Sequence, residues 1–292
     1  MKLTLCALII FLGLNNCSAQ QFNKQWMDCI VKLEREVNGQ LIYHGTGFQL
    51  YNYDRQTNDF EYIVTCAHIL RNRFIYISYP ATDTAITFFK KRNIEFITDN
   101  KNGTWYFDGN TFRMKFELKK DTTYFVNDSL DIGIIKFKTT LDFTVFGKDT
   151  VKLTKIKDIP KSQILLKNQV DVGSDVYFLG FPFSIGTNEG YRGSNWFNDS
   201  KINPVVRGGL IGWKAEYTSQ FLLDGLSYGG NSGSPIFTRF DPALKRQPSL
   251  IGMVQGHLGD DIVTSNETIP VNQGLARCIW IDDILELAKK VH

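Results

Sequence analysis

The sequence predicts an all-β fold made of two packed β-barrels and a C-terminal α-helix. Its strand-like runs are short, rich in β-branched and aromatic residues, and separated by glycine, asparagine and aspartate, which is typical of antiparallel β proteins. About 270 residues follow the leader described below, a length that suits two barrels better than one small domain. Near the C-terminus apolar residues recur instead at helical spacing: Ile281, Ile284, Leu285, Ala288 and Val291.

Residues 1–19 have the pattern of a secretory signal peptide. Lys2 precedes an apolar stretch from Leu3 to Leu14, and small residues end the segment at Ala19. The apolar stretch is too short for a comfortable transmembrane span, so we expect a secreted or periplasmic protein with no stable membrane span. An alternative is a lipoprotein signal with Cys17 acylated, although the two asparagines before Cys17 fit that motif poorly.

The rest of the chain is expected to divide into an arm and two barrels. Residues 20–37 are the predicted N-terminal arm. Residues 38–145 are the first barrel, with strands at 41–43, 47–51, 60–64, 74–77, 104–107, 111–116 and 132–137. Residues 146–292 begin with a lysine-rich crossover and contain the second barrel and the helix, with strands at 175–179, 204–211, 221–223, 235–237 and 250–254.

Charge and cysteine content limit the partners of the protein. The net charge of +3 is close to balanced, so nucleic-acid binding is not implied, and we favour a monomer, although the sequence leaves the oligomeric state open. Three cysteines lie outside the leader, so at most one disulfide forms within the mature chain; a bond between Cys29 and Cys278 is one possibility. Cys66 is expected to be a small buried apolar residue, and no residues have the spacing of zinc ligands.

The chemistry-bearing motif is the segment Gly230–Pro235, which reads GNSGSP. A serine between glycines sits in a tight, exposed turn, and Ser232 is the predicted nucleophile. His68 and Asp131 lie upstream, each beside a strand-like apolar run. The chain order His, Asp, Ser is that of one convergent catalytic triad. We therefore predict His68 as general base and then acid, with Asp131 orienting its imidazole.

Other residues compete for these roles. Asp128 is a rival carboxylate, but Asp131 directly precedes the β-branched run. Among the other histidines, His44 is predicted to end a strand and His257 follows the serine, out of order for the base. The backbone N–H groups of Gly230 and Ser232 are the predicted oxyanion-hole donors.

These segments together resemble the trypsin/chymotrypsin-like serine endopeptidases, and within them the bacterial branch of glutamyl endopeptidases and Deg/HtrA-type proteases, here without a PDZ domain. The likeness covers the three motifs above, the strand Gly45–Phe48 (GTGF) and the turn Gly180–Pro182 (GFP). It implies two six-stranded antiparallel barrels of the chymotrypsin-like type, a C-terminal helix and acyl-enzyme chemistry on polypeptides without metal or cofactor.

The resemblance also implies where a substrate binds. An extended peptide would pair with Gln255, Gly256 and His257, and the specificity pocket would be lined by three segments that include Leu226, Ser227, Val254 and Gly274. Leu226 at the pocket base offers no aspartate to attract lysine or arginine. Val254 stands where the glutamyl endopeptidases carry a histidine, for which His257 is a possible substitute. We expect a preference for small or medium apolar residues.

Activation and function are the remaining expectations. Asn231 replaces the aspartate that pairs with the new N-terminus of trypsin-like zymogens, so we predict activity without internal cleavage beyond loss of the leader; the sequence leaves open whether a short arm at 20–35 is removed as well. The leading hypothesis is a secreted serine endopeptidase. The alternative is a catalytically weak protease-like fold that acts as a binding or regulatory module. An esterase of the α/β-hydrolase type is disfavoured because its serine comes first in the chain.

Overall fold

The structure, a computed structural model, describes most of the chain. The described residues are 26–51, 60–99, 103–107, 109, 111–138, 143–146, 149–153, 157–181, 204–239, 247–263 and 268–291. The predicted leader and the last residue of the predicted turn Gly180–Pro182 lie outside them. Within these residues no helix is long and apolar enough to cross a membrane.

The first unit is an antiparallel sheet of nine strands, in the order β5-β6-β7-β4-β1-β2-β3-β9-β8. In chain order its strands are β1 (Ile30–Val37), β2 (Gln40–Leu50), β3 (Phe60–Thr65), β4 (Phe74–Pro80), β5 (Phe96–Asp99), β6 (Gly103–Phe107), β7 (Thr111–Glu117), β8 (Tyr124–Asn127) and β9 (Ile132–Lys138). The 3₁₀ helix η1 (Ala67–Leu70) follows β3. A separate two-stranded sheet is formed by β10 (Phe143–Phe146) and β11 (Asp149–Lys152).

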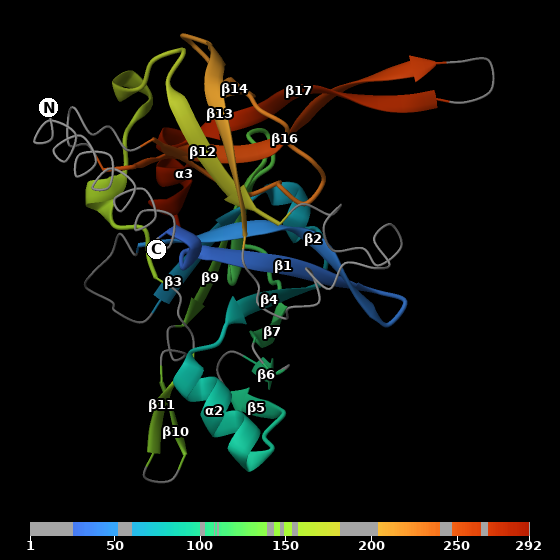
Figure 1. The fold of residues 1–292 in the computed structure, drawn as a ribbon, viewed down its shortest axis with the longest axis vertical. Helices are drawn as coiled ribbons and strands as arrows, with labels where there is room; N and C mark the ends of the chain where they lie inside the picture. Colours follow the sequence, from blue (N-terminus) through green and yellow to red (C-terminus); the bar gives the residue numbers. More distant parts are fainter. Residues whose placement is uncertain are drawn as a thin grey trace, which may run out of the picture.

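The second unit is a closed six-stranded barrel in the order β12-β13-β14-β17-β16-β15. Its strands are β12 (Asp175–Gly180), β13 (Val205–Lys214), β14 (Gln220–Asp224), β15 (Pro235–Thr238), β16 (Leu250–Val263) and β17 (Thr268–Trp280), with η2 (Lys161–Gln163) and η3 (Lys167–Gln169) before them. The hairpin of β16 and β17 extends well beyond the barrel (Figure 1). Helix α3 (Ile281–Ala288) ends the fold, and its buried apolar residues confirm the predicted helix.

The fold class is thus confirmed: the protein is all-β, with a closed barrel, a second β-sheet unit and a C-terminal helix, as expected for a chymotrypsin-like double barrel. The first unit is a sheet of nine strands, more than the seven runs read from the sequence and the six that the resemblance implied. It also carries an unpredicted helix, α2 (Asp83–Arg92), which begins after the N-cap Thr82, whose hydroxyl accepts a hydrogen bond from the N–H of Ala85. Phe89 of α2 is fully buried against Phe107 and Phe112.

The predicted arm, residues 20–37, is in part a central strand. Ile30–Val37 forms β1, which pairs with β2 on one side and β4 on the other. Trp26 is also buried and packs on Phe237 of the second unit, with ring centroids 4.5 Å apart. Removal of residues 20–35 would therefore take most of a core strand out of the sheet, so of the two possibilities left open by the sequence, trimming of that arm is incompatible with this fold.

The cysteine expectations have mixed outcomes. Cys29, Cys66 and Cys278 are all buried free thiols, so the suggested Cys29–Cys278 disulfide is absent. Cys66 has no exposed surface, as predicted, and its Sγ donates to the carbonyl of Val254 at 3.4 Å. Burial raises the pKa of the Cys66 thiol well above its usual value.

Candidate active site

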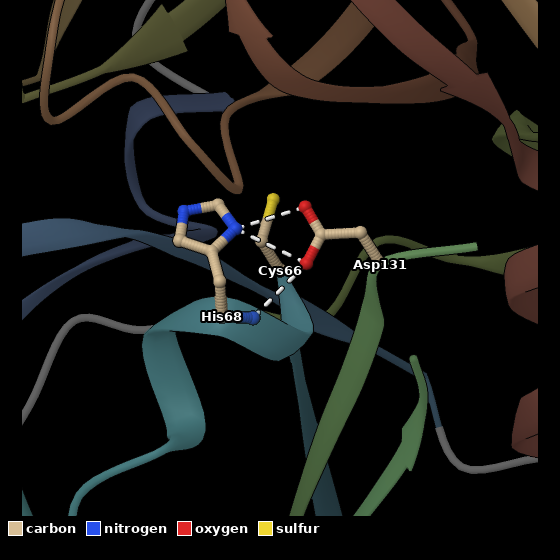
Figure 2. A group of neighbouring side chains, drawn as sticks. All are labelled: Cys66, His68 and Asp131. Atoms are coloured by element: carbon tan, nitrogen blue, oxygen red, sulfur yellow. Dashed lines mark hydrogen bonds and ion pairs between the residues drawn. The ribbon is translucent and has the colours of Figure 1, made fainter. Parts of the chain in front are cut away.

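Strand pairing brings His68 and Asp131 together. His68 lies in η1, directly after β3, and Asp131 lies directly before β9. These two strands pair with Thr65 opposite Gly133, so the residues that flank the pairing are neighbours in space. His68 Nδ1 lies 2.8 Å from Asp131 Oδ2 and 3.1 Å from Oδ1 (Figure 2). The backbone N–H of His68 also donates to Asp131 Oδ1 at 3.0 Å, which fixes the carboxylate against the ring.

The backbone at Asp131 is shaped for this contact. Its φ is +50°, in the left-handed region that few non-glycine residues adopt. The Asp131 carbonyl accepts the N–H of Ala67 at 3.3 Å. Burial alone would raise the pKa of the Asp131 carboxyl, but hydrogen bonds from the His68 ring and main chain, with the charges of His68 and Arg277, lower it below its usual value. Asp131 is therefore a carboxylate at neutral pH.

Ser232 lies in the turn between β14 and β15, held by two glycines with positive φ. Gly230 has φ +91° and Gly233 has φ +89°, values that residues with a Cβ rarely adopt. Within this turn the Gly233 N–H donates to the carbonyl of Val254 at 2.8 Å. The Ser232 hydroxyl donates to the carbonyl of Gln255 at 3.0 Å rather than to His68.

The first unit anchors this turn through Thr46, the second residue of the GTGF motif. The Thr46 N–H donates to the carbonyl of Ser232 at 2.8 Å, and its hydroxyl donates to the carbonyl of Gly230 at 2.9 Å. The N–H of Phe181, from the predicted Gly180–Pro182 turn, donates to the same hydroxyl at 3.1 Å. Both structural motifs read from the sequence therefore meet at the serine turn.

The N–H groups of Gly230 and Ser232 have no acceptor among the described residues, although the carbonyls of both residues are bonded. Free N–H groups beside a serine hydroxyl are able to stabilise an oxyanion. The Gln255 side chain adds a further link, because its Nε2 donates to the carbonyl of Leu130, the residue before Asp131.

A cleft of about 640 Å³ joins these groups. The predicted residues that line it are His68, Gly230, Ser232, Gln255, Gly256 and His257, and Tyr228, the residue after Ser227, lines it too. Asp131 is not among the lining residues, since it lies behind the His68 ring. The cleft thus brings together the predicted base, nucleophile and substrate strand.

Other predicted pocket residues lie elsewhere. Val254 has no exposed surface, and its side chain packs in the barrel core, because neighbouring side chains on a strand point to opposite faces; its predicted lining role is wrong. Leu226 is 52% exposed, and its carbonyl accepts from Arg207. Ser227 is fully buried, and Gly274 lies within β17, where its carbonyl accepts the N–H of Gly225, the residue after β14. None of these residues lines the described cleft.

The wall of the cleft facing the barrel was missed by sequence reasoning. It is formed by Arg35, Ile42 and His44 from the β1–β2 hairpin, together with Ile69. His44 directly precedes the GTGF motif, a position that could have indicated it. Arg35 was hidden because its strand was assigned to the arm.

Cys66, His68 and Asp131 also offer three ligand atoms within 4.8 Å of one another (Figure 2). A metal would require the thiolate form of Cys66, whereas burial favours the thiol, which donates to a carbonyl. Both carboxylate oxygens of Asp131 already accept hydrogen bonds from His68. This donor set fits a base–carboxylate pair better than a metal centre.

A scan against protein-family models finds no match for this chain, and a search of curated proteins finds none either. Among solved structures, one similar chain is Rv3671c from M. tuberculosis H37Rv, crystallised as a serine-to-alanine mutant in an inactive form. The two chains are 12% identical, the match covers 92% of this chain and 88% of that chain, and the TM-score is 0.42. A TM-score this low carries no conclusion about family or chemistry.

His44 makes stability depend on pH. Burial, with the charges of Arg35 and His68, lowers its pKa from 6.5 to about 4, and its Nε2 lies 3.3 Å from Asn72 Nδ2. At a pH between these two pKa values, His44 is mostly protonated in the unfolded chain and mostly neutral in the folded chain. The unfolding free energy is therefore expected to fall by about 1–2 kcal/mol as pH drops from 6.5 to 4.

Urea unfolding at several pH values checks this, with His44→Gln as the matched variant. The decrease in unfolding free energy between pH 6.5 and pH 4 should be smaller in the variant by about 1–2 kcal/mol. Identical pH profiles for the two proteins would show that His44 is protonated without strain in the folded state.

Proposed function

We propose that this protein is a serine endopeptidase that cleaves polypeptides through an acyl-enzyme intermediate. The observation that carries the proposal is one cleft lined both by a histidine that is paired with a partly buried carboxylate and by a serine, beside which two backbone N–H groups have no acceptor among the described residues. The motif likeness to the trypsin-like proteases, and to the glutamyl and Deg/HtrA-type branch, supports it at the level of sequence.

In the proposed reaction Asp131 fixes the proton of His68 on Nδ1, which leaves Nε2 free to act as the base. Ser232 Oγ turns from the Gln255 carbonyl, gives its proton to Nε2 and bonds to the carbonyl carbon of the substrate. The N–H groups of Gly230 and Ser232 bind the resulting oxyanion. The C–N bond then breaks, and His68 returns the proton to the leaving amine.

Water completes the cycle by the same route. It gives a proton to His68 Nε2 and attacks the acyl carbon, and the ester bond to Ser232 Oγ breaks as Ser232 recovers its proton. The substrate would be an extended chain paired with Gln255, Gly256 and His257, with a small or medium apolar residue before the scissile bond. The motif at residues 1–19 supports a secreted or periplasmic location.

One observation favours the alternative of a binding module with little turnover. The Ser232 hydroxyl is bonded to the Gln255 carbonyl, so the nucleophile and base do not yet form the hydrogen bond that catalysis needs. Such bonds often form only once substrate is bound, which is why we place the endopeptidase first.

Fluorophosphonate labelling of the purified protein, read by intact mass, tests the proposal. We expect one adduct per chain, because an activated serine beside a formed oxyanion site attacks this reagent. Ser232→Ala should abolish labelling. Ser234→Ala should keep it, because this change, two residues away, removes a buried hydroxyl that has no hydrogen-bond partner among the described residues. A correctly folded wild-type protein that takes no label would favour the binding module.

A further inference from the structure

Arg35 lies in the wall of the cleft, and within the part of the chain that the structure describes its guanidinium has no hydrogen-bond or ion-pair partner. It lies on β1 opposite Ile42 of β2, and both line the cleft that holds His68 and Ser232. Its Nε is shielded from solvent and has no hydrogen-bond partner. No described carboxylate pairs with its guanidinium. A shielded donor left unsatisfied is unfavourable, so such a group in a cleft indicates a ligand that supplies the acceptor.

The two acidic residues beside Arg35 in the sequence lie on the other face of the strand and pair with other side chains. Side chains alternate along a strand, so Glu34 and Glu36 point away from Arg35. Glu34 bonds to Lys32, Ser78 and Arg113. Glu36 accepts from Tyr76 at 2.6 Å and pairs with Lys115.

Arg35 therefore dominates the charge of the cleft. The ionisable side chains among its described lining residues are Arg35, His44, His68, Tyr228 and His257, and none of these residues carries a carboxylate. His44 is neutral at physiological pH because its pKa is lowered to about 4. An arginine presents several N–H donors in a plane that matches a carboxylate.

We propose that Arg35 binds a substrate carboxylate on the C-terminal side of the scissile bond. This rests on the proposed function, in which Gln255 to His257 pair with the residues before that bond. Arg35 and His44 belong instead to the unit that carries His68, the group that gives its proton to the leaving amine. The carboxylate belongs either to an acidic side chain or to the end of a short peptide.

Matched peptides test the proposal. One series has an amidated C-terminus and carries Glu or Gln at each of the first three positions after the scissile bond. A second compares the Gln peptide with a free or an amidated end close to that bond. At one position we expect kcat/KM for the peptide with the carboxylate to exceed that of its neutral match by about tenfold or more. The effect should occur in the first series if Arg35 binds an acidic side chain, and in the second if it binds the C-terminal carboxylate.

Variants assign the effect to Arg35. Arg35→Gln should remove the preference, and Arg35→Lys should retain part of it, because lysine keeps the charge but not the planar donor pair. Arg92→Gln, on the exposed face of α2 and outside the cleft, should leave the preference unchanged. Thermal unfolding of each variant separates a binding effect from a loss of fold.

Binding to Ser232→Ala, measured by calorimetry, keeps this inference separate from the proposed function. There the carboxylate peptide should bind more tightly than its neutral match, and the difference should vanish in the Ser232→Ala, Arg35→Gln double variant. Equal affinities would overturn the inference even if the wild type takes up fluorophosphonate. A preference only at positions before the scissile bond would also overturn it. An unlabelled wild type with a clear carboxylate preference in binding would refute the enzyme and retain the anion site.

Discussion

Replacement of Asp131 by asparagine is expected to lower kcat by about 10⁴-fold with little loss of fold. The carboxylate accepts both the ring and the main-chain hydrogen bonds of His68, and an amide can accept through only one of its two atoms. The amide nitrogen would face Nδ1 and favour the tautomer that carries its proton on Nε2, which cannot act as a base. Asparagine suits the left-handed backbone at φ +50°, so the change tests chemistry and not folding.

The measurement is kcat on a cleaved peptide, beside the rate of fluorophosphonate labelling. Asp128→Asn is the matched control, because Asp128 is the rival carboxylate in the same turn and its side chain is exposed. It should stay within about twofold of the wild type, as surface substitutions usually do. An Asp131→Asn protein with near-normal kcat, or an equally damaged Asp128→Asn protein, would refute the assigned role.

Gly233→Ala is expected to destabilise the protein by about 3 kcal/mol or more. A methyl group at this position would overlap the carbonyl oxygen of Thr46 and the hydroxyl of Thr65, which are hydrogen-bonded to each other. The positive φ adds strain of its own. Because Thr46 also anchors Ser232, labelling of the serine should be lost together with stability.

Urea unfolding checks this prediction against Gly173→Ala. Gly173 has φ +84°, but a methyl group there would meet nothing within 4 Å, so only the backbone strain of about 1–2 kcal/mol applies. The difference between the two variants isolates the steric overlap. Equal losses would mean that the serine turn can shift to accept the methyl group.

Much of the candidate site could be predicted from short sequence motifs. Two glycines beside Ser232, the His68 segment after a strand and Asp131 before one each reflect a local conformation, which is why short patterns revealed them. The substrate strand from Gln255 to His257 was implied by the resemblance to the trypsin-like proteases and stays a prediction. Val254 was misassigned because the alternation of side chains along β16 was not applied to it.

Features that depend on distant partners were missed. The segment Ile30–Val37 alternates apolar and charged residues irregularly, and Glu34 within it is only 3% exposed. That burial is possible only because Lys32, Arg113 and Ser78 satisfy the carboxylate. No local sequence pattern indicates such a network. The strand was therefore assigned to the arm, and Arg35 was not recognised as a residue of the cleft. Helix α2 could have been predicted from the sequence, because the N-cap Thr82 and Asp83 mark its start and basic residues mark its last turn.

The bonds from Thr46 to Gly230 and Ser232 also bear on how the protein folds. The turn that presents the serine is completed by a residue far away in the chain and in the other unit. A chain with only one unit folded, or with two undocked units, would lack the assembled turn. Contacts at such sequence separation form slowly. Under the proposed function, hydrolytic competence would be the last property acquired during maturation, and newly made copies would be poor enzymes while their own unfolded segments are still open to cleavage.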